Sequence, residues 1–411
     1  MKKQSNTPKI RFHNYKELWE CDGLKNIFGT IRNAFVGTAT PYYVEKGNFY
    51  LESNNVKNGK INYKSQIFIN DEFYEKQRDK WLKTNDIVMV QSGHVGHTAV
   101  IPKELNNTAA HALIVFTDYK KEVNPHFLNY QFQSSSKRKE LDLISTGNTI
   151  KHILASEMKS FKMDFPTVEE QSAIGSLFCT LDDLLASYKE NLANYQSLKA
   201  AMLSKMFPKV GQTIPEIRLD GFEGDWELLE INDLAGDFQS GGTPKTNVQE
   251  YWDGDIPWIQ SSDLETNCLF EIKVQKSISE KGLKNSSAKI IPKDSIAIVT
   301  RVGVGKLAVM RHEYATSQDF LSLSNLKSNI EFTAYLLYRL LQKEVTQLQG
   351  TSIKGITKVE LLSKKVLIPS LSEQKVIGAY FSNLDNLINT YQEKISQLET
   401  LKKKLLQDMF V

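Results

Sequence analysis

The sequence FPTVEEQSAIGSLFCTLDDLLASYKENLANYQSLKAAMLSKMF occupies residues 165–207 and predicts one long helix that starts at Pro166. One column of apolar side chains recurs every seven residues, at Ile174, Leu181, Tyr188, Tyr195 and Met202. A second column lies beside it, at Phe178, Leu185 and Leu192. Two such columns are typical of the a/d seam of a coiled coil. The stretch therefore predicts a helix that packs lengthwise against another helix.

A second copy of the same stretch ends the sequence and supplies the partner helix. Residues 368–410 read IPSLSEQKVIGAYFSNLDNLINTYQEKISQLETLKKKLLQDMF and align with the first copy without a gap. Matched identical pairs include Pro166/Pro369, Gln171/Gln374, Gly175/Gly378, Phe178/Phe381 and Tyr188/Tyr391. A helix of this length spans roughly 55–65 Å, which is too long for the interior of one globular domain. A single copy is more often an ordinary core helix, but two matched copies favour an exposed antiparallel coiled coil.

The duplication extends to the residues between the helices. Residues 8–29 align with residues 215–236, and further on each copy carries a β-branched segment that leads into a glycine-rich turn. Additional helical segments are predicted near residues 125–143 and 333–348. The chain therefore contains two repeats of about 200 residues, each a globular unit followed by a long helix.

The predicted fold class is a mixed α/β (α+β) fold with a pseudo-two-fold internal repeat. Its predicted parts are two globular units and two long helices, in the order 1–164, 165–207, 208–367 and 368–411. Residues 30–80 and 237–290 share little sequence apart from a strand-like character. A common framework with unlike variable parts predicts two related modules that recognise different things.

Composition excludes several classes of protein. A hydrophobic fraction of 41% is ordinary for a globular chain. The sequence lacks an apolar run of about 18 residues, so we expect no membrane span and a cytoplasmic protein. The three cysteines are widely spaced and predict free thiols. The net charge of +3, from 51 basic and 48 acidic residues, means that any nucleic-acid surface must be a local patch.

One block in the second unit has a distinctive sequence. It reads SGGTPK over residues 240–245, then YWDGDIPWIQ over residues 251–260. This block resembles the target-recognition signature of the DNA-specificity subunits of type I restriction-modification systems. The paired Pro-x-x-x-x-Glu-Gln segments that open the long helices resemble the conserved regions of the same family. The first unit carries a faint version of the signature over residues 37–51. The resemblance spans nearly the whole chain.

The resemblance implies a function and a set of partners. Each globular unit would be a target-recognition domain that reads one half of a bipartite site in double-stranded DNA. The coiled coil would set the spacer between the two halves and hold two adenine methyltransferase subunits. Restriction translocase-nuclease subunits would join the complex. The chain itself would be non-catalytic and would need no cofactor.

Residues that contact DNA are expected in the variable loops and turns, where polar side chains can reach base edges or phosphates. In the first unit we predict Lys57, Lys60, Lys64, Gln91, Ser92, His94 and His97. In the second unit we predict Lys245, Gln260, Ser261, Ser262, Arg301, Lys306 and Gln318. Lys151 and Lys354, which follow matched turns, are predicted to contact phosphates. For each of these residues taken alone, a solvated surface group is the alternative interpretation. Trp252 and Trp258 are interpreted as core residues of the second unit.

Several patterns suggest chemistry but have simpler explanations. Residues 124–127, Asn-Pro-His-Phe, resemble the Asn-Pro-Pro-Phe of adenine methyltransferases, but a helix cap at Asn124 is the favoured interpretation. The spacing of Asp255, Glu271 and Lys273 is loosely that of metal-dependent nucleases, and we attribute it to chance. The sequence has no phosphate-binding Gly-x-x-x-x-Gly-Lys-Ser/Thr loop.

Two further clusters of polar residues remain to be interpreted. His94, His97 and His111 could suggest a metal, but the matching turn of the second unit, residues 303–306, has no metal-ligating residues, so we predict no metal site. The basic cluster at residues 134–139 could be a phosphate clamp or the polar end of a helix. Both interpretations stay open.

Two functions from other classes compete with DNA recognition. The first is a coiled-coil scaffold that binds proteins without specific DNA recognition. The second is a single-chain modification enzyme, which the missing cofactor loop makes the weaker alternative.

Overall fold

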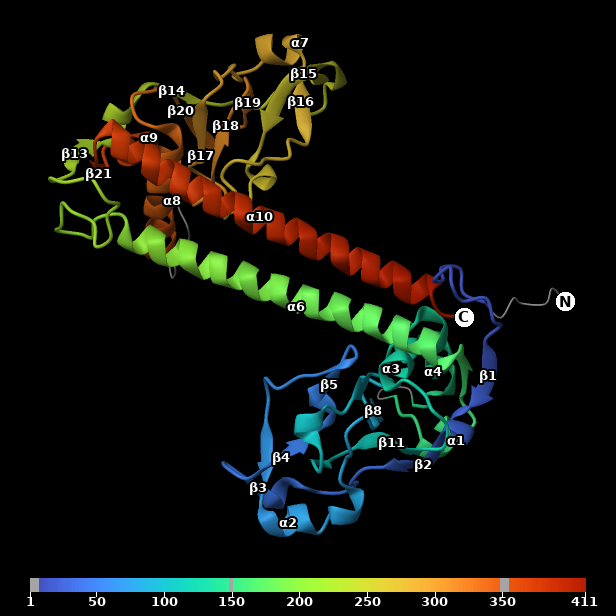
Figure 1. Ribbon diagram of the computed structural model, residues 1–411. Coiled ribbons are helices and arrows are strands. Elements are labelled where there is room, and N and C mark those ends of the chain that lie inside the picture. Colours follow the sequence, from blue (N-terminus) through green and yellow to red (C-terminus); the bar gives the residue numbers. More distant parts are fainter. Residues whose placement is uncertain (1–6, 148–150, 348–354) are drawn as a thin grey trace. The chain divides into compact units, whose positions relative to one another are not determined.

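A computed structural model describes residues 7–147, 151–347 and 355–411 (Figure 1). The contacts divide the chain into two compact units. Unit 1 comprises Met1–Lys189 and Glu393–Val411, and unit 2 comprises Glu190–Gln392. Both units combine helices with small sheets, so the predicted mixed α/β class with an internal repeat is confirmed.

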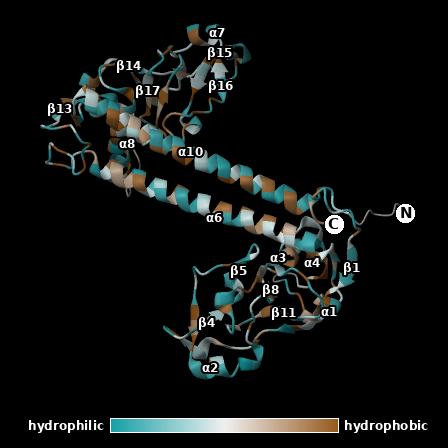
Figure 2. Cartoon of the chain, in the orientation of Figure 1, coloured by the Kyte–Doolittle hydropathy of each residue, from teal (hydrophilic) through white to brown (hydrophobic). Residues whose placement is uncertain are grey.

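The two long helices are present, and each unit contains half of both. They are α6 (Val168–Lys205) and α10 (Leu371–Asp408). Figure 2 shows hydrophobic residues recurring along both helices between hydrophilic ones. The predicted seam is largely buried, and Tyr195 and Tyr391 place their ring centroids 5.5 Å apart in unit 2.

The predicted start of the long helix at Pro166 is wrong by two residues. Phe165 still belongs to strand β12 (Lys162–Phe165), so the chain leaves the strand before it can begin the helix. The backbone N–H of Glu170 donates to Thr167 Oγ1 over 3.4 Å, which makes Thr167 the N-cap. Pro166 therefore precedes the cap and does not occupy the first helical turn.

Unit 1 is built on a four-stranded antiparallel sheet. The strand order of this sheet is β2-β11-β8-β9, and a second sheet has the order β10-β4-β7-β3. Strand β1 pairs with β12, and β5 pairs with β6 as a hairpin. The strands are β1 (Glu20–Gly23), β2 (Phe28–Asn33), β3 (Tyr43–Val44), β4 (Asn48–Leu51), β5 (Val56–Lys57), β6 (Lys60–Ile61), β7 (Ile67–Ile69), β8 (Ile87–Val90), β9 (Thr98–Val100), β10 (Ala109–Ala110) and β11 (Leu113–Tyr119). The shorter helices are α1 (Leu24–Ile27), α2 (Asp71–Glu75), α3 (Pro125–Gln133), α4 (Ser135–Ile144) and α5 (Ala155–Met158).

Unit 2 repeats the four-stranded sheet and the pair of terminal strands, whereas its second sheet has three strands instead of four. Its four-stranded sheet has the order β14-β20-β17-β18, a second sheet has the order β16-β15-β19, and β13 pairs with β21. The strands are β13 (Glu227–Glu230), β14 (Ala235–Ser240), β15 (Trp252–Ile259), β16 (Lys276–Ile278), β17 (Ser295–Val299), β18 (Leu307–Met310), β19 (Ala315–Thr316), β20 (Phe320–Leu326) and β21 (Lys365–Ile368). The shorter helices are α7 (Glu280–Lys284), α8 (Ile330–Gln347) and α9 (Lys358–Leu362).

The helical segment predicted near residues 125–143 is interrupted in the middle. Helix α3 stops at Gln133, and Ser134 Oγ accepts a hydrogen bond of 3.3 Å from the backbone N–H of Lys137. Ser134 therefore caps a new helix, α4, instead of continuing the first one. In unit 2 the matching segment is the unbroken helix α8, which begins at Ile330.

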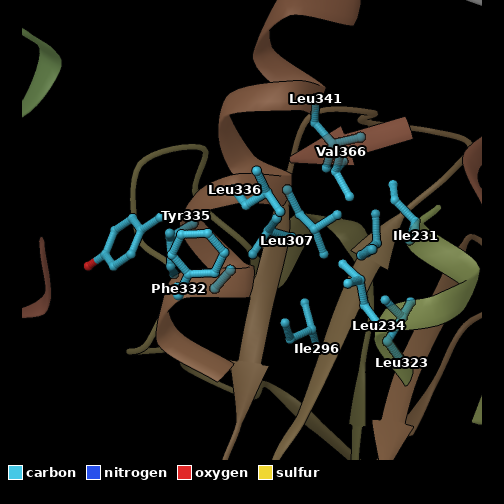
Figure 3. Close-up of a cluster of buried hydrophobic side chains, with 14 of the residues drawn as sticks. Ile231, Leu234, Ile296, Leu307, Leu323, Phe332, Tyr335, Leu336, Leu341 and Val366 are labelled. Atoms are coloured by element: carbon cyan, nitrogen blue, oxygen red, sulfur yellow. The ribbon is translucent and has the colours of Figure 1, made fainter. Parts of the chain in front are cut away.

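A buried aromatic cluster forms the centre of each unit. In unit 1, Trp19 packs against Phe127 with ring centroids 5.6 Å apart, and Phe410 lies 5.7 Å from Phe178. In unit 2 the matching rings are Trp226, Phe332, Phe381 and Phe207. Figure 3 shows part of this unit 2 core around Phe332. Each core thus includes a ring from the end of the long helical stretch of the other sequence repeat.

The described part of the chain contains no helix long and apolar enough to cross a membrane. Cys21, Cys179 and Cys268 are free thiols, as expected.

The aromatic clusters predict that Phe410, after the end of α10, stabilises unit 1 and that Phe207, after the end of α6, stabilises unit 2. Replacing the buried ring of Phe410 by alanine should lower the free energy of unfolding of unit 1 by about 4 kcal/mol, because a large cavity opens in its core. Hydrogen exchange should accelerate at the amides of β8 and β11 and stay unchanged at those of β17 and β20. Phe207→Ala is the matched control and should give the reverse pattern. Equal loss of protection in both units after either substitution would contradict this assignment.

Candidate nucleic-acid interface

In unit 1 the turn between β8 and β9, residues 91–97, lies against the β5–β6 hairpin. Asn58 and Gly59 both have positive φ, 51° and 83°, as an Asn-Gly hairpin turn of type I′ requires. Gly59 pairs with Ala99 on β9, and the backbone N–H of Asn58 donates to His97 Nδ1 over 3.1 Å. The hairpin and the turn therefore place Lys57 and His97 in one group.

The hydrogen bond to His97 fixes the chemistry of its ring. Because Nδ1 accepts a hydrogen bond from the backbone N–H of Asn58, the ring proton of the neutral form is on Nε2. Burial lowers the pKa of His97 to about 4, with smaller contributions from the neighbouring groups Arg138, His94 and Lys57. His97 is therefore neutral at physiological pH and acts as a hydrogen-bond donor at Nε2.

A backbone ladder joins Lys151 to the same turn. The N–H of Gly93 donates to the carbonyl of Lys151 over 3.2 Å, and the N–H of Ile153 donates to the carbonyl of Gln91 over 3.0 Å. The Lys151 ammonium lies 3.1 Å from a carboxylate oxygen of Asp142. The structure thus brings together Lys57, Gln91, Ser92, His94, His97 and Lys151.

Two of the predicted residues of unit 1 lie outside this group. The Lys60 ammonium lies 3.9 Å from Asp182 Oδ2 and lines a cavity of about 410 Å³ with Tyr130 and Cys179. Lys64 is exposed beyond the hairpin, where its backbone N–H donates to Asn62 Oδ1 over 3.0 Å. Neither side chain has a described contact with residues 91–97.

In unit 2 the β17–β18 turn lies against the short 3-10 helix η7 (Ser261–Asp263). The Lys306 ammonium donates to the carbonyl of Ser261 over 3.3 Å, and Lys306 follows the turn as His97 does in unit 1. The start of β20 lies beside them, because the N–H of Thr300 donates to the carbonyl of Asp319 over 2.7 Å. Backbone contacts therefore bring together the segments that carry Gln260, Ser261, Ser262, Arg301, Lys306 and Gln318.

The tryptophans of the signature block are structural, as predicted. Trp258 is buried and its indole N–H donates to the carbonyl of Gly242 over 3.0 Å. Trp252 packs edge-on against Trp258, with ring centroids 5.1 Å apart, and donates to the carbonyl of Lys245 over 3.2 Å. A Cβ atom at Gly242 would clash with the backbone of Ser287, which explains the glycine. Lys245 thus lies on a loop that these rings hold in place, whereas Lys354 lies outside the described residues.

The structure also decides among the other sequence patterns. Asn124 caps α3, because its Oδ1 accepts a hydrogen bond of 3.0 Å from the N–H of Phe127. Lys137 is buried and ion-paired with Asp164 at 3.0 Å, so this lysine of the basic cluster cannot serve as a phosphate clamp. Among the residues that the structure describes, no three His, Cys, Asp or Glu side chains are grouped as metal ligands.

Sequence reasoning did not select one basic residue of the unit 1 group. An Arg138 guanidinium nitrogen lies 3.4 Å from His97 Nδ1, and burial lowers the pKa of Arg138. Its presence in the cluster at residues 134–139 was the available signal. Sequence alone could not show which cation of the cluster faces the turn, because that depends on the break between α3 and α4.

Known proteins resemble this chain in both sequence and fold. The model of the type I restriction modification DNA specificity domain matches residues 42–194 and 223–400. The putative type I restriction enzyme MjaX specificity subunit of Methanocaldococcus jannaschii is 22% identical over 98% of this chain and 95% of its own. The MjaIX specificity subunit of the same organism is 29% identical, but that match covers 46% of this chain and 44% of its own.

Solved structures agree on the fold. The crystal structure of the type I restriction-modification S subunit from M. genitalium superposes with a TM-score of 0.64 at 16% identity, over 98% of this chain and 99% of its own. A structure from a study of type I R-M system assembly and conformational transition gives a TM-score of 0.51 at 16% identity, over 94% of this chain and 96% of its own. Since the domain model matches more than half of the sequence, in one stretch per repeat, this chain belongs to the type I restriction modification DNA specificity family.

Proposed function

We propose that this chain is the sequence-specific DNA-recognition subunit of a type I restriction-modification complex. Residues 1–164 and 208–367 are its two target-recognition domains, and each reads one half of a bipartite site. The observation that carries the proposal is that each unit contains the same four-stranded sheet, whereas the turns at matched positions of that sheet differ in sequence. The four-stranded sheets of the two units have the same strand order, yet the turns after β8 and β17 present different polar residues.

The chemistry of the turns suits base recognition. Unit 1 offers the Nε2–H donor of His97 and the half-buried amide of Gln91, whose Oε1 is buried, while unit 2 offers the cations of Arg301 and Lys306. Amide and guanidinium groups are the side chains that discriminate base edges in the major groove. Two turns with different donors and acceptors would read two different half-sites.

The partners are part of the same proposal. The long helices, residues 165–207 and 368–411, would set the spacer between the half-sites and hold two adenine methyltransferase subunits. Translocase-nuclease subunits would join when the complex restricts DNA. The chain itself is non-catalytic in this scheme, and the methyltransferase supplies the chemistry.

Genome-wide adenine methylation tests this function directly. Cells that carry the cognate methyltransferase subunits should methylate a split motif only when this chain is also present. The motif gives both half-sites and the spacer. If an active methyltransferase modifies the same sites with and without the chain, DNA recognition is excluded and the coiled-coil scaffold becomes the better explanation.

Exchange of one recognition domain should change one half-site. A chimera in which residues 9–160 come from another member of the family should methylate a motif with one new half and one unchanged half. Unit 2 keeps all its residues in this chimera and serves as the internal control. A change in both halves would contradict independent reading by the two domains.

Lengthening the coiled coil should lengthen the spacer. One heptad inserted in each long helix keeps the a/d seam in register and adds about 10 Å per helix, or roughly three base pairs of B-DNA. Methylation mapping of this variant should show the original half-sites with a longer spacer. An unchanged spacer would mean that the helices do not set the distance.

A further inference from the structure

Helix α4 packs directly on the β8–β9 turn of unit 1. Gly96 has φ of +77°, and a Cβ atom at this position would lie 3.1 Å from Leu141 Cδ1 and 3.8 Å from Arg138 Nη1. The guanidinium of Arg138 is therefore held beside the turn, and it extends to 3.4 Å from His97 Nδ1.

Arg138 is a half-buried cation without a matched anion. Within residues 7–147, 151–347 and 355–411, no carboxylate lies within ion-pair distance of its guanidinium. Its polar contact is His97 Nδ1, which already accepts a hydrogen bond from Asn58. A cation that is partly removed from water and is not ion-paired with a carboxylate is unfavourable, so an anionic ligand would stabilise it.

The neighbouring lysine on the same helix has its charge balanced. Lys137 lies 3.0 Å from Asp164 and 3.2 Å from Glu140. The two adjacent basic residues thus differ, because the charge of Lys137 is paired with carboxylates of the same unit and that of Arg138 is not.

The other charged groups near Arg138 favour an anion. Lys57 is a second cation whose charge acts on His97, and the ring of His94 lies 6.1 Å from that of His97 between centroids. Asp142 is the carboxylate whose charge reaches Arg138, and it is ion-paired with Lys151 at 3.1 Å. The cations Lys57, Arg138 and Lys151 therefore outnumber the carboxylate of Asp142 around this turn.

Unit 2 has a neutral residue at the matched position. Gln342 precedes Val345 on α8 as Arg138 precedes Leu141 on α4, and both Val345 and Leu141 lie against the glycine of the turn. The Gln342 side-chain amide donates to the carbonyl of Gly305 over 2.7 Å, so its hydrogen bonding is satisfied within the unit. An arginine is not required by the framework at this position.

We propose that Arg138 binds a phosphate of the DNA backbone at the β8–β9 turn of unit 1. This proposal rests on the proposed function, since it assumes that the turn faces DNA. A phosphodiester provides both the negative charge and the paired acceptor oxygens that a guanidinium fits, whereas a base edge offers only neutral acceptors. Arg138 would then position the domain on the duplex, while neighbouring groups read the sequence.

The test compares three full-length variants with the wild-type chain in complex with its methyltransferase subunits. Arg138→Gln introduces the residue that unit 2 has at this place and removes the charge. Arg138→Lys keeps the charge. Lys139→Gln removes an exposed charge one residue further along the helix and is the matched control. Binding is measured from about 50 to 200 mM salt on a duplex with the methylated motif and on a shuffled duplex.

R138Q should weaken binding to both duplexes by a similar factor, roughly tenfold at the lower salt, and should reduce the slope of log K against log salt by about one. R138K and K139Q should keep the wild-type slope. An unchanged slope for R138Q would overturn the proposal, and so would a loss confined to the motif duplex, which would indicate base reading. If the wild-type complex does not distinguish the two duplexes, the proposed function fails, while the salt slopes still report on Arg138.

Discussion

The aromatic cluster at the centre of each unit is the interaction on which the rest of the structure depends. In unit 1, Phe410 completes the cluster around Trp19 and Phe127, although it lies at the far end of the second sequence repeat. In unit 2, Phe207 completes the matching cluster from the end of the first repeat. Neither repeat therefore contains a complete core of its own. The sequence repeat and the folding unit are offset from each other by half a long helix.

The residues shared by the two repeats serve this architecture. The guanidinium of Arg11 donates two hydrogen bonds of 2.7 Å to Glu170, and that of Arg218 donates two, of 2.9 and 2.8 Å, to Glu373. Gln171 donates to the carbonyl of Pro166 over 2.9 Å and accepts from the N–H of Asn124 over 3.1 Å. The Pro-x-x-x-x-Glu-Gln segment therefore joins the strand before the helix, the helix itself and the cap of α3. The matching segment of unit 2 makes the same junction, because Gln374 donates to the carbonyl of Pro369 over 2.8 Å and accepts from the N–H of Asn329 over 2.9 Å.

Sequence periodicity predicted the long helices correctly, because their apolar pattern repeats over many residues. It did not predict helix ends that a single hydrogen bond determines. The seven-residue spacing of apolar positions identified both long helices, because burial along a helix imposes that period. The break between α3 and α4 at Ser134 was not predicted. There the hydrogen bond from the N–H of Lys137 to the Ser134 hydroxyl starts a new helix, although the helical sequence pattern continues. Most predicted contact residues fall in two groups around matched turns. Lys60 does not, because the opposing carboxylate of Asp182 comes from a helix more than a hundred residues away.

If the two turns read bases as we propose, their contacts explain why the side chains alone do not give the sequence that is read. In unit 1 the residue after the turn is His97, whose ring nitrogen accepts a bond from the hairpin at Asn58. In unit 2 the matching residue is Lys306, which donates instead to the carbonyl of Ser261. The half-buried side chain after each turn thus also fixes the position of that turn. A substitution at this position changes the donor and moves the backbone that presents it, so a fixed code between residue and base is lost. The framework strands are unaffected, because their hydrogen bonds run between backbone atoms.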